Sequence, residues 1–340
     1  MIVTIKRVHM PRLLVYSGIV ACALLALVGV AWLANASWWS SYEAKTTILA
    51  HRGLHQTYTR EHLESDTCTA NRIHLPEHGY LENTLDSMAA AFELGADVVE
   101  LDIHPTTDGQ FAVFHDWTID CRTNGKGVTR KQSMAYLKTL DIGYGYSADG
   151  GATYPFRGKF VGAMPTLDEV FERFPDKRFL INIKSRDPEE GRQLAKRLKQ
   201  LPTEHQARLM SYGGDEPENT LSSEMPNMKT MGKKRLMECM TRYVAYGWIG
   251  IVPQACHNTL ILIPENYATL LWGWPNRFVE RMHLAGSEVY LRGPYGSKSH
   301  FPAGIDTVEQ LKAVPKSFAG GIWTDRIDLV ATHRRMMSTD

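Results

Sequence analysis

The sequence predicts an α/β protein, a parallel barrel of alternating strands and helices preceded by one transmembrane helix. Short apolar runs rich in β-branched residues alternate with helical segments, which is the pattern of a parallel α/β barrel. The 340 residues accommodate one such barrel without a second domain. An uncharged apolar run near the N-terminus is long enough to cross a bilayer.

The N-terminal segment predicts a signal anchor. The charged side chains of residues 1–12 are all basic: Lys6, Arg7 and Arg12. Residues 13–34 then carry no charge, so we expect residues 1–12 in the cytoplasm and the barrel on the periplasmic or extracellular side of the cytoplasmic membrane. Ala34-Asn35-Ala36 fits a cleavage site, and a cleaved signal peptide is the alternative, although the apolar run exceeds the about 7–15 residues usual there. Trp38 and Trp39 are expected at the outer interface.

The barrel is expected over residues 46–330, with the apolar run 47–50 as its first strand. His51 ends this strand, and a histidine facing a site can move protons near neutral pH. Arg52 follows it, and a guanidinium can hold phosphate oxygens through two parallel hydrogen bonds.

Residues 54–81 form a long polar insertion before the next regular element. A loop this long in a compact domain usually has a function, and we interpret it as a substrate lid at the mouth of the site. A second metal site is the alternative, although the spacing of its potential ligands matches no compact metal-binding motif. Those potential ligands are His55, Glu61, His62, Glu64, Asp66, His74 and His78.

Glu82-Asn83-Thr84 precedes a helix with an apolar stripe. Asn83 or Thr84 can cap this helix, and Gly95 can end it in the left-handed conformation. Glu82 is therefore expected at the mouth of the site. We assign it to substrate binding, with metal ligation or support of a metal ligand as the alternatives.

The next strand, residues 97–103, carries two carboxylates two positions apart, after Asp97 at its start. Alternate strand residues share a face, so Glu100 and Asp102 project together while the apolar residues between them face the other way. Paired carboxylates suit a hard divalent cation, Mg²⁺ or Ca²⁺. An edge strand with a solvated acidic face is the alternative.

A further histidine and a lysine also end strands. His115 follows the run 111–114, and Asn182 and Lys184 share a face of the strand 178–184. Between these strands, residues 117–163 are expected to form a long loop with one short helix near 131–140.

The second half of the chain is less patterned. We expect helices over 166–174 and 189–201, and we interpret Pro217-Glu218-Asn219-Thr220 as a surface turn. Further strands are predicted near residues 207–212, 248–252, 289–292 and 320–324.

Composition and cysteine use narrow the class. The chain is 44% hydrophobic and 22% charged with a net charge of +1, which is ordinary for a globular protein and predicts no nucleic-acid surface. Cys22 lies in the apolar run, and four further cysteines form an even set suited to an oxidising compartment. We predict the pairs Cys68–Cys121 and Cys239–Cys256, with four free buried thiols as the alternative.

The ordered series of motifs resembles the glycerophosphodiester phosphodiesterase family. The resemblance is specific in the first half and weaker in the second, where it continues over residues 122–127, 137–143, 165–170, 182–184 and 324–325. Its most specific motifs are His51-Arg52-Gly53, Glu82-Asn83-Thr84, Glu100-Leu101-Asp102, Asp108-Gly109 and Val113-Phe114-His115-Asp116.

The resemblance implies a (β/α)₈ TIM-type barrel, a divalent cation and hydrolysis of a glycerophosphodiester to an alcohol and glycerol 3-phosphate. It implies that His51 and His115 are the acid–base pair, that Glu100 and Asp102 ligate the metal, and that Arg52 and Lys184 contact phosphate.

Three features depart from the family's pattern. Asn182 stands where a third metal-ligating carboxylate is usual, the interval between Arg52 and Glu82 is long, and residues 289–292 replace a Trp-Thr strand motif of the substrate wall. Two alternative functions stay open. The membrane anchor leaves open lysophospholipase D-like cleavage of a lipid headgroup at the membrane, and the changes at Asn182 and at residues 289–292 leave open a barrel that binds phosphodiesters without catalysis.

Overall fold

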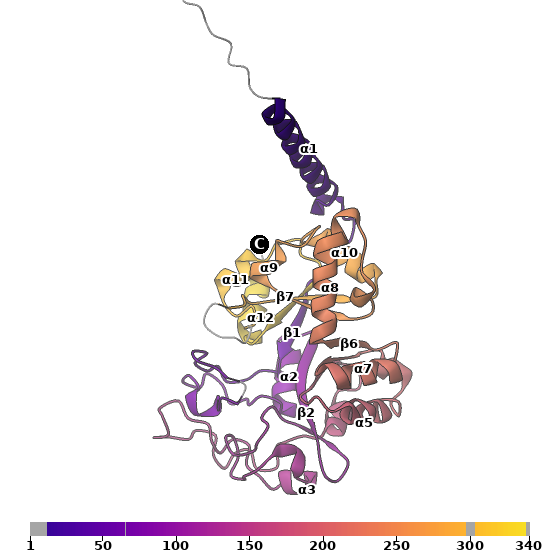
Figure 1. Cartoon of the computed structure of the whole chain (residues 1–340). Helices are drawn as coiled ribbons and strands as arrows, with labels where there is room; N and C mark the ends of the chain where they lie inside the picture. The colour runs from indigo at the N-terminus through magenta and orange to yellow at the C-terminus, as the bar shows by residue number, and fades with distance from the viewer. Residues whose placement is uncertain (1–11, 65, 297–302, 338–340) are drawn as a thin grey trace, which may run out of the picture.

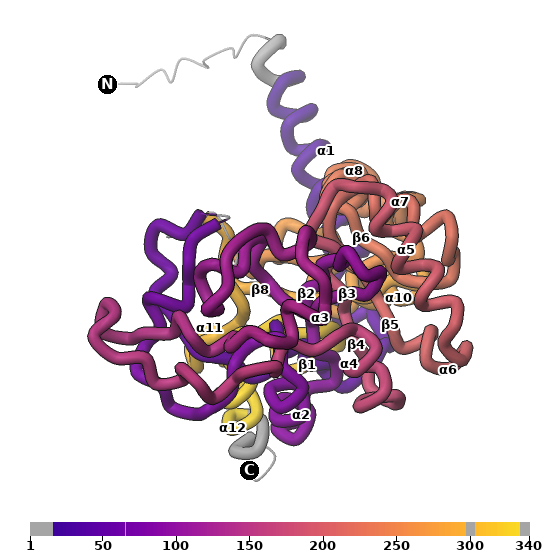
Figure 2. The backbone as a smooth tube through the Cα atoms, turned by 90° about the horizontal axis from the view of Figure 1, so that it is seen from below, coloured from indigo at the N-terminus to yellow at the C-terminus, as the bar shows by residue number. Residues whose placement is uncertain are grey.

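The computed structural model describes residues 12–64, 66–296 and 303–337. Eight parallel strands form a nearly closed barrel in the order β6-β5-β4-β2-β1-β9-β8-β7, and β3 pairs antiparallel with β2. Figure 2 shows these strands in the centre with the helices around them. The strands are β1 (Thr47–His51), β2 (Val98–Pro105), β3 (Phe111–Val113), β4 (Arg178–Ile183), β5 (Leu209–Gly213), β6 (Lys229–Gly232), β7 (Leu260–Pro264), β8 (Glu288–Arg292) and β9 (Gly321–Thr324).

The helices begin at defined caps. Thr84, Thr166 and Thr307 each accept a hydrogen bond from the third helical residue, whose side chain returns one to the capping backbone. The helices around the barrel are α2 (Leu85–Glu93), α3 (Met134–Leu137), α4 (Leu167–Arg173), α5 (Pro188–Leu198), α6 (Thr203–Gln206), α7 (Asp215–Glu224), α8 (Lys233–Tyr246), α9 (Glu265–Ala268), α10 (Asn276–Leu284), α11 (Val308–Ala313) and α12 (Ile327–Met337).

Strand alternation separates an outer core from an inner one. Val99, Leu101 and Ile103 of β2 pack outward in the core shared with the helices. The inner core is apolar, and its members include Leu49, Leu180, Met210, Tyr290 and Trp323. Toward the carboxyl ends of the strands the inward positions become polar, which is where a barrel of this kind carries its active site.

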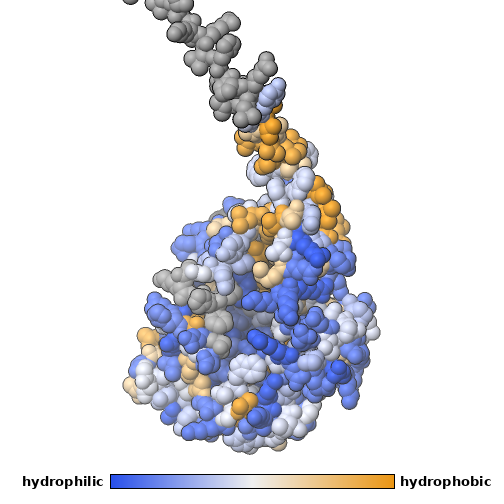
Figure 3. Space-filling model, in the orientation of Figure 1, coloured by the Kyte–Doolittle hydropathy of each residue, from blue (hydrophilic) through white to orange (hydrophobic). Residues whose placement is uncertain are grey.

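The N-terminal helix α1 (Arg12–Ala34) projects from the barrel (Figure 1). Within the described ranges, its segment Tyr16–Ala34 is the one candidate membrane span, and none of that segment is buried in the protein. Its surface is predominantly hydrophobic, in contrast to the polar surface of most of the barrel (Figure 3).

The insertion 54–81 packs against the long loop that follows β3. The disulfide Cys68–Cys121 joins the two segments, and the second predicted disulfide, Cys239–Cys256, is also present. An apolar cluster extends this contact and contains Ala70, Ile73, Leu81, Tyr146 and Phe156. Both predicted disulfide pairs are therefore confirmed.

One predicted strand is wrong, and two strands were not predicted. Residues 248–252 are apolar but form the end of a 3₁₀ turn, Gly247–Ile249, and an irregular segment. Gly250 there has a φ of 85°, which an extended strand does not allow. The strands in this part of the barrel are instead β6 and β7. A hydrogen bond from Thr259 Oγ1 to the carbonyl of Thr230, at 2.6 Å, links their ends.

The surface turn predicted at residues 217–220 is also wrong, because these residues lie inside α7. Pro217 is tolerated there because the first turn of a helix does not need its backbone N–H groups. Glu218 is buried and accepts a hydrogen bond from Ser211 Oγ at 2.7 Å. Burial raises the pKa of Glu218 from 4.5 to about 8.

Glu218 predicts a measurable dependence of stability on pH. The unfolded chain releases the proton of this carboxyl near pH 4.5. The folded protein keeps it up to about pH 8. The free energy of unfolding therefore falls as pH rises through this window, by up to about 1.4 kcal/mol per pH unit. Glu218→Gln is expected to reduce this fall, which thermal unfolding from about pH 5 to about pH 8 would measure, and the buried Glu100, whose pKa is also raised, contributes to the remainder. Glu216→Gln, at an exposed position of the same helix, should retain it; equal slopes in both variants would contradict the assignment.

Candidate active site

Four neighbouring strands bring polar side chains to one end of the barrel. The strand register pairs His51 of β1 with Glu100 of β2, and Asp102 of β2 with Asn182 of β4. Asn182 is in turn paired with Tyr212 of β5. Residues that are level in a parallel sheet project to the same face, so these five side chains converge inside the mouth of the barrel.

Glu100 is fully buried, which excludes the solvated edge strand considered above. Its Oε1 accepts a hydrogen bond from the Tyr212 hydroxyl at 2.7 Å. Its Oε2 lies 3.7 Å from His51 Nε2 and has no hydrogen-bond partner among the described residues. Burial and then the nearby charge of Asp102 raise the pKa of Glu100 to about 8. A buried carboxylate oxygen without a donor fits the coordination of a cation.

Asp102 lies beside Glu100 but is surrounded by donors. It accepts a hydrogen bond from the Asn83 amide at 3.0 Å and from the Asn182 amide at 2.9 Å. Arg52 Nε lies 3.2 Å from one of its oxygens and Lys184 Nζ lies 3.5 Å from the other. Burial alone would raise the pKa of Asp102, but Lys184 and then Arg52 outweigh it and hold the pKa well below its usual value.

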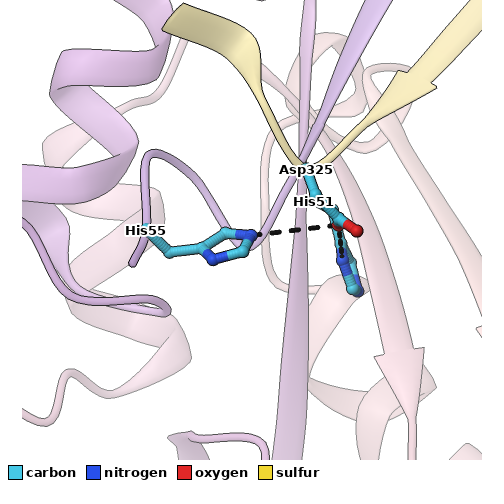
Figure 4. A group of neighbouring side chains, drawn as sticks. All are labelled: His51, His55 and Asp325. Carbon is cyan, nitrogen blue, oxygen red and sulfur yellow. Dashed lines mark hydrogen bonds and ion pairs between the residues drawn. The ribbon is translucent and has the colours of Figure 1, made fainter. Parts of the chain in front are cut away.

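His51 is oriented by an aspartate from the last strand of the barrel. Its Nδ1 lies 2.5 Å from Asp325 Oδ1 (Figure 4). Asp325 also accepts a hydrogen bond from Arg60 at 2.8 Å. Burial and then Arg52 lower the pKa of His51 to about 3, so its imidazole is neutral. The bond to Asp325 keeps the single ring proton on Nδ1. The lone pair of Nε2 is consequently directed toward Glu100.

His55 of the insertion also approaches Asp325, with its Nε2 3.8 Å from Oδ1 (Figure 4). Within the described part of the chain, one group of three or more His, Cys, Asp or Glu side chains lies close enough together to bind a single metal ion. It consists of His51, His55 and Asp325. Two other histidines of the insertion bond elsewhere: His74 to Thr57 and His78 to Gln56.

His115 is oriented as His51 is, by an aspartate that also accepts a hydrogen bond from an arginine. Its Nδ1 lies 2.7 Å from Asp116 Oδ1, and Arg122 donates to the second oxygen of Asp116 at 2.9 Å. Arg122 also donates to Glu82, and Arg52 donates to the other oxygen of Glu82, both at 3.0 Å. Glu82 thus links the two arginines, and they overcome the effect of burial to lower its pKa to about 2.

The wall of the site contains an aromatic ring and a cation. The Trp323 ring centroid lies 5.0 Å from that of His51 and 5.7 Å from that of Tyr212. The guanidinium of Arg292, at the end of β8, lies 4.4 Å over the same Trp323 ring. The replaced strand motif at residues 289–292 therefore contributes a positive charge, and β9 supplies the tryptophan.

All eight residues singled out from the sequence lie in this network. Five partners were given no role in the active site, and they are Asn83, Asp116, Arg122, Tyr212 and Asp325. All but Tyr212 lie in motifs of the family resemblance, and Asp116 directly follows His115 while Asp325 ends the last apolar run, as His51 ends the first. Tyr212 also ends a predicted strand, but nothing in the sequence shows that β5 lies near Glu100.

Comparison with known proteins agrees with this geometry. A relative from Caldanaerobacter subterraneus subsp. tengcongensis, a glycerophosphodiester phosphodiesterase, is 44% identical over 103 residues, which are 30% of this chain and 38% of the relative. The match thus spans about two-fifths of the relative's length.

Solved structures share the fold over most of the chain. The glycerophosphodiester phosphodiesterase from Agrobacterium tumefaciens superposes with a TM-score of 0.55 at 23% identity, covering 86% of this chain and all of the other. A phosphodiesterase from Oleispira antarctica, solved with the product sn-glycerol-3-phosphate, superposes with a TM-score of 0.51 at 17% identity, covering 86% and 96%. The Glycerophosphoryl diester phosphodiesterase family pattern matches residues 51–329, and the chain belongs to that family.

Proposed function

We propose that this protein hydrolyses glycerophosphodiesters to an alcohol and glycerol 3-phosphate. The observation that carries the proposal is the pair of histidines, each bonded through Nδ1 to an aspartate. Each imidazole has its Nε2 left to exchange a proton with substrate. The cations Arg52 and Lys184 flank the buried carboxylates between them. Family membership and the product in the Oleispira antarctica structure support the same activity.

The reaction needs one proton removed and one delivered. An oxygen nucleophile bonds to phosphorus as the bond from phosphorus to the leaving alcohol breaks. One histidine accepts the nucleophile's proton and the other donates a proton to the departing oxygen. Arg52 and Lys184 bind the phosphate oxygens and stabilise the negative charge that they carry.

The site residues fit a divalent cation. Glu100 offers a buried oxygen without a donor, Asp102 lies on the same face of the strand, and Asn182 is level with Asp102 on β4. The Asn182 amide, which donates to Asp102 here, would present its oxygen after a rotation. We propose these three as ligands of Mg²⁺ or Ca²⁺, which prefer oxygen donors; the bound ion would neutralise phosphate charge. The group of His51, His55 and Asp325 is the alternative cation site.

Asn182→Asp is expected to strengthen cation binding because a ligand charge tunes divalent affinity. We expect the Mg²⁺ or Ca²⁺ concentration for half-maximal activity to fall on the order of tenfold. Titration of activity with each ion after treatment with a chelator would measure this. Unchanged half-maximal concentrations in Asn182→Asp, together with a large rise in His55→Ala, would place the ion at the alternative group.

The activity itself is tested by release of glycerol 3-phosphate from glycerophosphocholine and glycerophosphoethanolamine. The full chain in detergent should release it with Mg²⁺ or Ca²⁺ and not with EDTA, and His51→Ala should abolish release. Lysophosphatidylcholine in the same assay tests the headgroup-cleaving alternative, which the apolar helix α1 motivates. Binding of glycerophosphocholine without turnover of any of these substrates would leave the non-catalytic barrel.

We further propose that α1 is a retained anchor with residues 1–12 in the cytoplasm and the barrel outside. The basic N-terminus and the two disulfides support this orientation. A cleaved signal peptide is the alternative. N-terminal sequencing of the protein from membranes decides between them, because cleavage after Ala36 would give a chain beginning at Ser37.

A further inference from the structure

The helix α1 is fastened directly to the barrel. Asn35, next to the end of α1, donates to the carbonyl of Trp248 at 2.7 Å and accepts from Arg281 Nη1 at 2.7 Å. Two residues later, Ser37 Oγ accepts the backbone N–H of Asn276 at 2.8 Å. Asn35 is itself buried. The barrel is therefore held at the end of α1 rather than tethered by a free linker.

Exposed apolar side chains surround this attachment, and we call them the junction patch. They lie just after α1, at the C-terminal end of α8 and in the segment that follows it, and they are between 40% and 64% exposed. In Figure 3, hydrophobic surface gathers on the barrel beside the base of α1. The patch consists of Trp38, Trp39, Val244, Trp248, Ile249 and Ile251.

The patch is rigid and its own side chains carry no charge, while the half-buried Arg277 borders it beside Trp38 and Trp39. The disulfide Cys239–Cys256 closes the segment that carries four of its residues, and Trp272 Nε1 donates to the Val244 carbonyl at 2.9 Å. No Asp, Glu, Lys, Arg or His occurs over residues 243–256. A fixed apolar surface of this kind marks an interaction site. Its continuity with the unburied apolar side of α1 indicates that the bilayer crossed by α1 is what covers it.

The patch lies at the opposite end of the barrel from the active site. Helices of a β/α barrel run back from the carboxyl to the amino ends of the strands, so the C-terminal end of α8 is at the amino end. Figure 1 shows α1 on one side and the insertion with the long loop after β3 on the other. The linker to β1 likewise borders a hollow at the amino end, where Tyr42 and Lys45 lie beside the first residues of four strands: Thr47, Arg178, Lys229 and Glu288.

We infer that the outer leaflet covers the junction patch and that the barrel rests on the bilayer by its amino end. The active site then opens away from the membrane. Its substrates are consequently water-soluble glycerophosphodiesters, from which the acyl chains have already been removed, and not lysophospholipids held in the bilayer. The inference rests on the proposed phosphodiesterase activity and on retention of α1 as an anchor.

Lipid quenching of site-specific fluorophores tests this arrangement in the full chain reconstituted into phosphatidylcholine–phosphatidylglycerol vesicles. The free thiol Cys22, within α1, is labelled first with an environment-sensitive dye and reports whether the anchor is in the bilayer. In a Cys22→Ser background, Ile251→Cys carries the dye in the patch. Leu75→Cys, an exposed apolar position in the insertion, is the matched control. Labelling without reductant preserves both disulfides.

The inference predicts quenching at positions 22 and 251 and none at 75. Lipids brominated near the headgroup should quench position 251 most, since interfacial groups lie about 5–10 Å deep. Quenching at 22 without quenching at 251 would overturn the docking while leaving the anchor intact. Quenching at 75 would overturn the orientation, and none at 22 would overturn the anchor on which the docking rests.

Activity in the same vesicles tests the substrate class separately. Glycerophosphocholine should exceed embedded lysophosphatidylcholine in kcat/KM by roughly tenfold or more, because the acyl chain holds the lysolipid headgroup at the bilayer, away from an active site that opens into water. Preferential turnover of the lysolipid would overturn the inferred substrate class. Absence of turnover of either substrate, with the quenching pattern intact, would remove the proposed function and leave the docking in place.

Discussion

Asp325→Asn is expected to lower kcat by about 10⁴-fold, as when the aspartate that orients a catalytic histidine becomes an amide. Asp325 accepts the Nδ1 proton of His51 and so leaves Nε2 as the basic nitrogen. An asparagine in its place can donate its amide to Nδ1, which would move the ring proton to Nε2 and remove the base. Initial rates with glycerophosphocholine would measure the loss.

The control is Asp328→Asn, which removes the same charge three residues later from a carboxylate bonded to Arg326. It should retain activity within a few-fold, and near-UV circular dichroism should show both variants folded. If saturating divalent cation restored the rate of Asp325→Asn, Asp325 would be holding the metal in the group with His51 and His55. Activity of Asp325→Asn within about tenfold of the parent at the same cation concentration, one that is just saturating for the parent, would show that His51 needs no partner.

The first half of the site could be predicted because its residues lie on, or directly after, strands that follow one another in the sequence. The alternation of β2 places Glu100 and Asp102 together, and the parallel register then sets His51 beside Glu100. Each of these statements depends on the period of a strand, which the sequence shows directly. The sequence alone left open whether the acidic face of β2 points into solvent or into the barrel. Both carboxylates are buried, so this face points into the barrel.

The partners of these residues could not be predicted because they depend on barrel closure. Asp325 reaches His51 only because β9 pairs with β1, and Tyr212 reaches Glu100 across β4 from β5. Neither contact has a counterpart in local sequence. The same holds for Arg122, which joins Asp116 to Glu82 from a loop without regular structure.

The strand predictions failed between β5 and β8 because apolar residues there serve two purposes. Some fill the core, and others form an exposed surface. Residues 248–252 are apolar enough for a buried strand, yet Ile249 and Ile251 are about half exposed. The real strand β6 is short and contains Lys229 and two uncharged small residues, Thr230 and Gly232. Hydrophobicity in this region thus follows the surface next to α1 more closely than it follows the core.

The disulfide Cys68–Cys121 is expected to matter for both stability and activity. Its cysteines are 53 residues apart, so replacing both with alanine should lower the free energy of unfolding by about 4 kcal/mol through loop-closure entropy. Activity should also be lower than that of the parent at temperatures where the variant is still folded. Cys121 precedes Arg122, which donates to Thr69 at 2.7 Å next to Cys68 and positions both Asp116 and Glu82. Loosening the insertion therefore loosens the support of the proposed acid–base pair.

The second disulfide supplies a matched comparison. Cys239 and Cys256 are 17 residues apart, so their double alanine variant should lose a similar amount of stability, about 3 kcal/mol. It lies at the other end of the barrel, however, and should keep the parent kcat wherever it remains folded. Urea unfolding followed by circular dichroism, with rates measured well below each midpoint, separates the two effects. Equal kcat in both double variants would show that the loop around Arg122 holds its position without the disulfide, and that the insertion contributes only stability.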